Sequence, residues 1–119
     1  RKAGKLNSLL WLQLERGLAG LGPNADYSRL TVAYEPVWAI GTGQTASDED
    51  IRMVHTLVRE LLSSLLGSNG IGIQILYGGS VKPDNAKAVL SLDNVDGLLV
   101  GGASLQAQSF ADIVRADLA

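Results

Sequence analysis

Apolar residues follow two alternating patterns along the chain: short continuous runs, and longer stretches with helical spacing. The continuous runs cover residues 30–34, 73–76 and 97–100, and each run predicts a short buried strand. A helical stretch precedes the first run, and another follows each of the three runs. The pattern therefore predicts one leading helix and three strand–helix units.

The leading helix is expected over residues 6–21, where four leucines share one face and glycines and a proline end the pattern. The leucines are Leu10, Leu14, Leu18 and Leu21, and the residues that end the helix are Gly20, Gly22 and Pro23. Trp11 on this helix is interpreted as a packing residue. No strand precedes the helix in this chain.

The second helix is predicted to start after Ser47, which is a good capping residue followed by an acidic first turn. One apolar stripe then runs as far as Gly67 and consists of Ile51, Val54, Val58, Leu61, Leu62 and Leu65. His55 lies at the edge of this stripe and is interpreted as structural.

Two further helices complete the pattern. Pro83 suits the first turn of a short helix that carries Ala86, Val89 and Leu90. The closing helix is marked by Phe110, Ile113, Val114 and Leu118. Three successive strand–helix units imply right-handed parallel units of an α/β domain that occupies residues 1–119. Alternation alone does not choose between an open sheet and a barrel.

Composition excludes several classes of function. The 119 residues are 46% hydrophobic and 18% charged, with no cysteine, one histidine and a net charge of −2. We therefore expect no disulfide framework, metal site or redox cofactor, and no basic surface for nucleic acid. No apolar run is long enough to cross a bilayer, so we expect a cytoplasmic protein without membrane association.

A carboxylate stands where the first strand ends. Glu35 directly precedes Pro36, which disfavours helix at Glu35 and stops the strand. The following segment combines a rigid apolar hinge with small residues at 41–43, the composition of a mobile lid. Glu35 is either an ordinary solvent-facing glutamate or a general base under a closing loop.

Two glycine pairs, Gly78-Gly79 and Gly101-Gly102, each lie between a strand and a helical start. Such backbone can approach an anion and donate N–H groups to it, although one pair alone could simply turn the chain. Like Glu35, both pairs follow the carboxyl end of a strand, where barrel enzymes keep their sites.

A competing motif, GTGQTA, is similar to the dinucleotide fingerprint, with Glu60 near the distance of a ribose-binding acid. That fingerprint requires its first glycine immediately after a strand, whereas residues 36–40 intervene here. We therefore discard nicotinamide binding.

Four stretches together resemble the triosephosphate isomerase family in order and spacing: RKAGK, AYEPVWAIGTG, ILYGGSVKPDNA and VDGLLVGGASL. The resemblance covers essentially the whole chain. It implies the C-terminal half of a (β/α)8 TIM barrel, from the loop after the fifth strand to the end. The leading helix would then be the fifth of eight.

The resemblance also implies roles for individual residues. Glu35 would be the base that moves a proton between the two carbons of dihydroxyacetone phosphate and glyceraldehyde 3-phosphate, without a cofactor. Gly41, Ser80, Gly101 and Gly102 would bind the phosphate, while Tyr77 and Ser80 would brace the closed lid. That lid would consist of Pro36, Val37, Trp38, Ala39, Ile40, Gly41, Thr42, Gly43, Gln44, Thr45 and Ala46.

The chain departs from the family in what it omits. The lysine, asparagine and histidine that contact the substrate in this family belong to loops that would precede Arg1, and His55 matches none of them. The start at Arg1 leads us to expect a piece of a longer protein. One hypothesis is an enzyme portion completed by an N-terminal half or by self-association. The other is a non-catalytic half-barrel that folds or assembles without isomerase activity.

Overall fold

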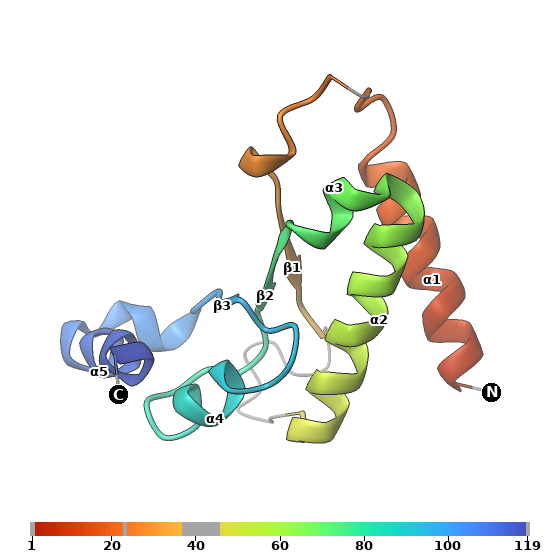
Figure 1. Cartoon of the computed structure of the whole chain (residues 1–119). Helices are drawn as coiled ribbons and strands as arrows, with labels where there is room; N and C mark the ends of the chain where they lie inside the picture. The colour runs from red at the N-terminus through yellow and green to blue at the C-terminus, as the bar shows by residue number, and fades with distance from the viewer. Residues whose placement is uncertain (1, 23, 37–45, 119) are drawn as a thin grey trace.

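The computed structural model of the chain describes residues 2–22, 24–36 and 46–118. It contains the predicted leading helix and three strand–helix units (Figure 1). The elements in order are α1 (Lys2–Gly17), η1 (Tyr27–Arg29), β1 (Thr31–Tyr34), α2 (Asp48–Leu66), α3 (Ser68–Ile71), β2 (Gln74–Tyr77), α4 (Ala86–Leu90), β3 (Gly97–Leu98), η3 (Gly102–Leu105) and α5 (Ala107–Leu118).

The three strands form one parallel sheet in the order β1-β2-β3. Thr31 pairs with Gln74 and Tyr34 with Tyr77, while β3 pairs with the end of β2. The predicted strand over residues 97–100 is too long, because its partner β2 ends at Tyr77. After Leu98, a single backbone bond from the Leu99 N–H to the Tyr77 carbonyl, 2.9 Å long, continues the pairing.

In the part of the chain that the structure describes, helices cover only one face of this sheet. Val32 and Tyr34 of β1, together with Ile75 of β2, contribute to an apolar cluster with residues of α1 and α2. A second cluster joins Tyr77 to α4 and α5. On the opposite face, Thr31, Ala33 and Gln74 are exposed. The sheet is therefore packed against helices on one face, and its other face is bare.

Helix α2 follows its sequence signals closely. The Ser47 hydroxyl accepts a bond from the Asp50 N–H at 3.1 Å, and three acidic residues occupy the first turn. The helix ends at Leu66 and is capped by Gly67, which adopts a φ of 62°. Most of the predicted stripe is buried: Ile51, Val54, Val58, Leu61 and Leu62.

Helix α1 differs from its prediction at both ends. The RKAGK stretch, expected as a loop, is helical from Lys2. The other end comes at Gly17, after which i→i−3 bonds such as Leu21 N–H to Leu18 carbonyl replace the helical pattern. Leu21 thus lies beyond the helix, 43% exposed, while Leu10 is buried. Glycines at 17, 20 and 22 weaken the helix before Pro23 is reached.

An arginine of α2 ties together the amino-terminal side of the sheet. The guanidinium of Arg59 donates to the carbonyls of Gly70, Ile71 and Ile73, which lie on the path from α3 into β2. It also forms an ion pair of 2.7 Å with Asp96, just before β3. The same Asp96 oxygen accepts the Ile75 N–H at 2.9 Å. One side chain, 17% exposed, therefore positions the entries to two strands.

Replacement of this arginine by lysine, Arg59→Lys, should lower the free energy of unfolding by about 1 to 3 kcal/mol. An ammonium cannot reproduce the planar fork that serves several carbonyls and a carboxylate. Urea denaturation followed by circular dichroism measures the loss. The matched control is Arg52→Lys on the same helix, whose exposed pair with Glu49 should contribute far less to stability. Equal losses in the two variants would show that the bonds of Arg59 to the carbonyls and to Asp96 stabilise the fold no more than an exposed ion pair does.

His55 lies deeper than its predicted place at the edge of the stripe, because its side chain is fully buried. Its ring lies about 6 Å from those of both Tyr34 and Tyr77, at 5.9 and 6.0 Å between centroids. Nδ1 is 2.9 Å from the Asn94 carbonyl, which can only accept, so Nδ1 carries the proton. Nε2 is buried without a hydrogen-bond partner among the described residues. Burial lowers the pKa of His55 below its ordinary value of 6.5.

The lowered pKa predicts loss of stability in acid. The folded state holds His55 neutral, so its contribution is complete above pH 6.5 and falls as the pH drops below that value. Between pH 7.5 and 5.5 the free energy of unfolding should therefore decrease. Urea denaturation at the two pH values, compared with His55→Gln, isolates this contribution. An identical pH dependence in the two proteins would show that His55 does not titrate on unfolding.

Candidate active site

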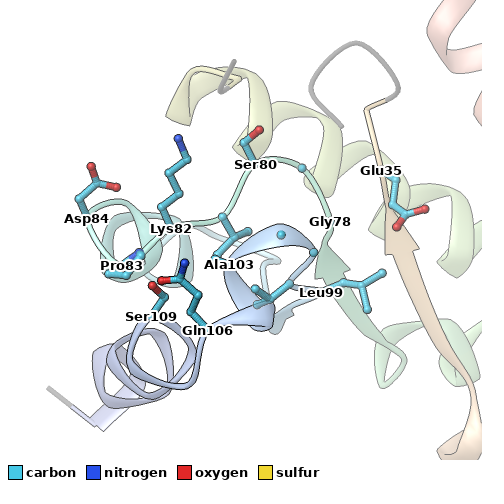
Figure 2. Close-up of a pocket in the computed structure, with 15 residues that line it drawn as sticks. Glu35, Gly78, Ser80, Lys82, Pro83, Asp84, Leu99, Ala103, Gln106 and Ser109 are labelled. Carbon is cyan, nitrogen blue, oxygen red and sulfur yellow. The ribbon is translucent and has the colours of Figure 1, made fainter. Parts of the chain in front are cut away.

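A cavity of about 810 Å³ opens at the carboxyl ends of the three strands. Glu35 contributes from the end of β1, residues 78–84 from the connection after β2, and residues 99–103 from the connection after β3. Figure 2 shows Glu35 on one side of this hollow, with Ser80, Lys82 and Asp84 along the loop on the other. Gln106 and Ser109 close the side formed by α5.

Glu35 is held beside Gly78 by the continuation of strand pairing. The Gly78 N–H donates to the Tyr34 carbonyl at 2.8 Å, one step past the strands. A Cβ atom at Gly78 would lie 2.6 Å from Glu35 Cγ, so only glycine leaves room for the glutamate side chain. Glu35 also borders a second hollow of about 530 Å³ between α1 and β1, to which α1 contributes four leucines.

The neighbouring residue, Gly79, makes room for a different side chain, that of Tyr77. Tyr77 is fully buried, and a Cβ atom at Gly79 would lie 2.0 Å from its hydroxyl. That hydroxyl makes no hydrogen bond within the described residues. Burial raises the pKa of the Tyr77 phenol, and the backbone N–H of Ala46 acts in the opposite direction without reaching hydrogen-bond geometry. Both glycines of this pair are thus required by packing within the chain.

The second pair, Gly101-Gly102, differs because packing against the described residues does not require glycine at either position. A Cβ atom at either residue would meet no described residue within 4 Å. The Gly101 carbonyl accepts both the N–H and the hydroxyl of Ser104, at 2.9 and 2.6 Å, and η3 begins at Gly102. Bare backbone therefore borders the cavity at the start of a short helical turn.

Four of the predicted site residues, namely Glu35, Ser80, Gly101 and Gly102, line this one cavity. Gly41 and the central lid residues 37–45 lie outside the described residues. The two ends of the predicted lid, Pro36 and Ala46, are described and buried. The roles assigned to these residues remain predictions.

Sequence reasoning missed the polar residues on the far side of the cavity. Lys82 and Asp84 follow β2, while Gln106 directly precedes α5 and Ser109 lies in its first turn. The one available signal was the turn sequence KPDN, which places polar groups at a helix start. Among the described residues, no three histidine or carboxylate side chains come together as metal ligands would. Nor is any helix in the described ranges long and apolar enough to cross a membrane.

The close packing at Gly78 gives a testable consequence. Gly78→Ala should push Glu35 aside or displace the loop, at a cost of about 1 to 3 kcal/mol in unfolding free energy. Gly102→Ala, where the added methyl group meets open space, should cost less than about 1 kcal/mol. Urea denaturation of the two variants compares the sites directly. If Gly78→Ala is as stable as Gly102→Ala, Glu35 does not occupy the space beside Gly78.

Comparison with known proteins provides an independent view of the chain. A family profile described as triosephosphate isomerase matches residues 1–117. Curated proteins named triosephosphate isomerase from Nitratidesulfovibrio vulgaris and Lawsonia intracellularis are 56% and 54% identical over 116 residues, which is 98% of this chain. The chain spans about half of these relatives, 46% of each.

A solved structure agrees with the sequence comparison. The crystal structure of triosephosphate isomerase from Bartonella henselae is 39% identical and superposes with a TM-score of 0.82. The match covers all of this chain and 46% of that structure. The open three-stranded wall is therefore similar to part of a larger α/β barrel.

Proposed function

The chain belongs to the triosephosphate isomerase family, and we propose that it supplies the base and the phosphate-binding loops of that isomerase. The whole protein would interconvert dihydroxyacetone phosphate and glyceraldehyde 3-phosphate. One observation carries the proposal: Glu35, Ser80 and the backbone at Gly101-Gly102 line a single cavity at the carboxyl ends of parallel strands.

Glu35 acts as the base in this proposal. Its carboxylate takes a proton from the hydroxyl-bearing carbon of dihydroxyacetone phosphate, and the electron pair moves to the carbonyl oxygen to form an enediolate. Return of the proton to the neighbouring carbon, with proton exchange between the two oxygens, gives the aldehyde. The room left by Gly78 lets the Glu35 side chain stand at the edge of the cavity, within reach of a small substrate.

Neutral backbone groups hold the phosphate in this proposal. The bare backbone at Gly101-Gly102 and the Ser80 loop face the same hollow, and N–H groups at a turn are suitable donors to phosphate oxygens. Gly41 is part of the proposal through family resemblance alone.

The electrophile that polarises the substrate carbonyl comes from another part of the assembly. In the family, a lysine and a histidine contact the substrate, and by resemblance no residue of this chain matches either of them. The chain spans 46% of its relatives. We propose that an N-terminal half, or a second copy, completes the barrel against the bare face of the sheet. A cytoplasmic location is part of the same proposal.

A non-catalytic half-barrel remains the second candidate. The observation in its favour is that Thr31, Ala33 and Gln74 leave one face of the sheet uncovered, so the described residues form an open wall. Such a chain could assemble and bind phosphate without turning over a triose.

The base assignment is tested in the completed barrel by Glu35→Gln. The amide cannot accept the carbon-bound proton, so turnover should fall by at least about a hundredfold, the scale of a lost general base. Binding of glycerol 3-phosphate, measured by calorimetry, should persist. The matched control is Glu60→Gln on the exposed face of α2, which should leave turnover unchanged. Retention of most activity in Glu35→Gln would reduce Glu35 to an ordinary strand-end carboxylate.

A further inference from the structure

Asn85 uses both ends of its side-chain amide on the loop that lines the cavity. Its Nδ2 donates to the Ser80 carbonyl at 2.9 Å, and its Oδ1 accepts the Lys82 backbone N–H at 2.8 Å. A carbonyl can only accept and an N–H can only donate, so one orientation of the amide satisfies both bonds. The side chain therefore clamps two positions of the Ser80–Lys82 segment at once.

The clamp is anchored in α4, a helix with one buried face. The Asn85 carbonyl accepts the Val89 N–H at 3.1 Å, and the Asn85 N–H donates to the Lys82 carbonyl at 3.2 Å. Ala86 and Val89 of α4 are fully buried in the core cluster. The loop is thus fastened to an element that cannot shift without disturbing the core.

The two bonds also determine how the loop presents its backbone. The C=O and N–H of a trans peptide point in opposite directions, so fixing the Ser80 carbonyl also fixes the direction of the Val81 N–H. The Lys82 N–H is directed at Asn85 and is not offered to a ligand. All three residues line the cavity, and within the segment only Val81 is buried.

We propose that Asn85 is a positioning residue for phosphate binding: it holds the Ser80–Lys82 segment in the conformation that receives the phosphate. This inference rests on the proposed function, since it concerns the same cavity. Asn85 touches the loop rather than the substrate, so its loss should act on the affinity for phosphate more than on the chemical step.

The test uses the chain in its completed assembly, with inorganic phosphate and glycerol 3-phosphate as probes. Asn85→Ala removes both bonds and should weaken the binding of both probes by roughly three- to tenfold, as the loss of one or two hydrogen bonds predicts. KM should rise by a similar factor, while kcat changes less than about twofold. Asn85→Asp keeps the acceptor for Lys82 but loses the donor to Ser80, and its carboxylate faces the Ser80 carbonyl and adds negative charge near the phosphate, so it should bind the probes no better than Asn85→Ala.

The matched control is Ser91→Ala at the other end of α4. Ser91 also makes a hydrogen bond to the backbone, from its hydroxyl to the Ala88 carbonyl at 2.6 Å, but it does not line the cavity. Its replacement should lower stability without changing the affinity for phosphate. If Asn85→Ala does not fold, Asn85→Asp carries the same comparison.

The outcomes distinguish a failure of the proposed function from a failure of the inference about Asn85. If the unaltered assembly binds neither probe, the proposed function fails and the inference fails with it. If the unaltered assembly binds but the Asn85 variants bind equally well, the inference alone is wrong. An affinity loss in Ser91→Ala equal to that in Asn85→Ala would also overturn it, because general weakening of α4 would then explain both.

Discussion

The parallel register of three short strands is the constraint on which the candidate site depends. Pairing of Tyr34 with Tyr77, and of Tyr77 with Leu98, brings the ends of all three strands to one edge of the sheet. The bond from the Gly78 N–H to the Tyr34 carbonyl extends this alignment past the strands. A shift of two residues in either pairing would separate Glu35 from the glycine loops by roughly 7 Å. At the other end of the strands, Arg59 and Asp96 hold the register in place.

Hydrophobic patterning predicted the helices, the strands and their parallel order, because each element buries one periodic face. The stripe of α2 and its Ser47 cap are strong local signals of this kind. The early end of α1 at Gly17 and the short α3 were missed, since glycine-rich segments carry little periodic information. Pattern also placed His55 at the edge of a stripe, whereas the structure buries it against two tyrosine rings that are distant in sequence.

The candidate site was predictable in its residues but not in their contacts. Position after a strand pointed to Glu35 and to the two glycine pairs, whereas the family resemblance was needed to choose Glu35 as a base and to include Ser80. What position could not reveal is that Gly78 and Gly79 make room for Glu35 and Tyr77, because that requires knowing where two side chains point. Asn85 escaped notice for a related reason: an asparagine before a helix is commonly a cap, and here its side chain turns back onto the loop instead.

The bare face of the sheet connects fold and function. A parallel sheet is normally covered on both faces, and β1 and β3 present unpaired edges in the described part of the chain. Completion by further strands would cover that face and supply the electrophile that this chain lacks by family resemblance.

The most direct measurement is a steady-state isomerase assay of the purified chain, with mass spectrometry to exclude a second polypeptide, repeated after an N-terminal half is added. The account predicts negligible turnover alone and turnover on addition. Turnover by the chain alone, close to that of a complete isomerase, would contradict it.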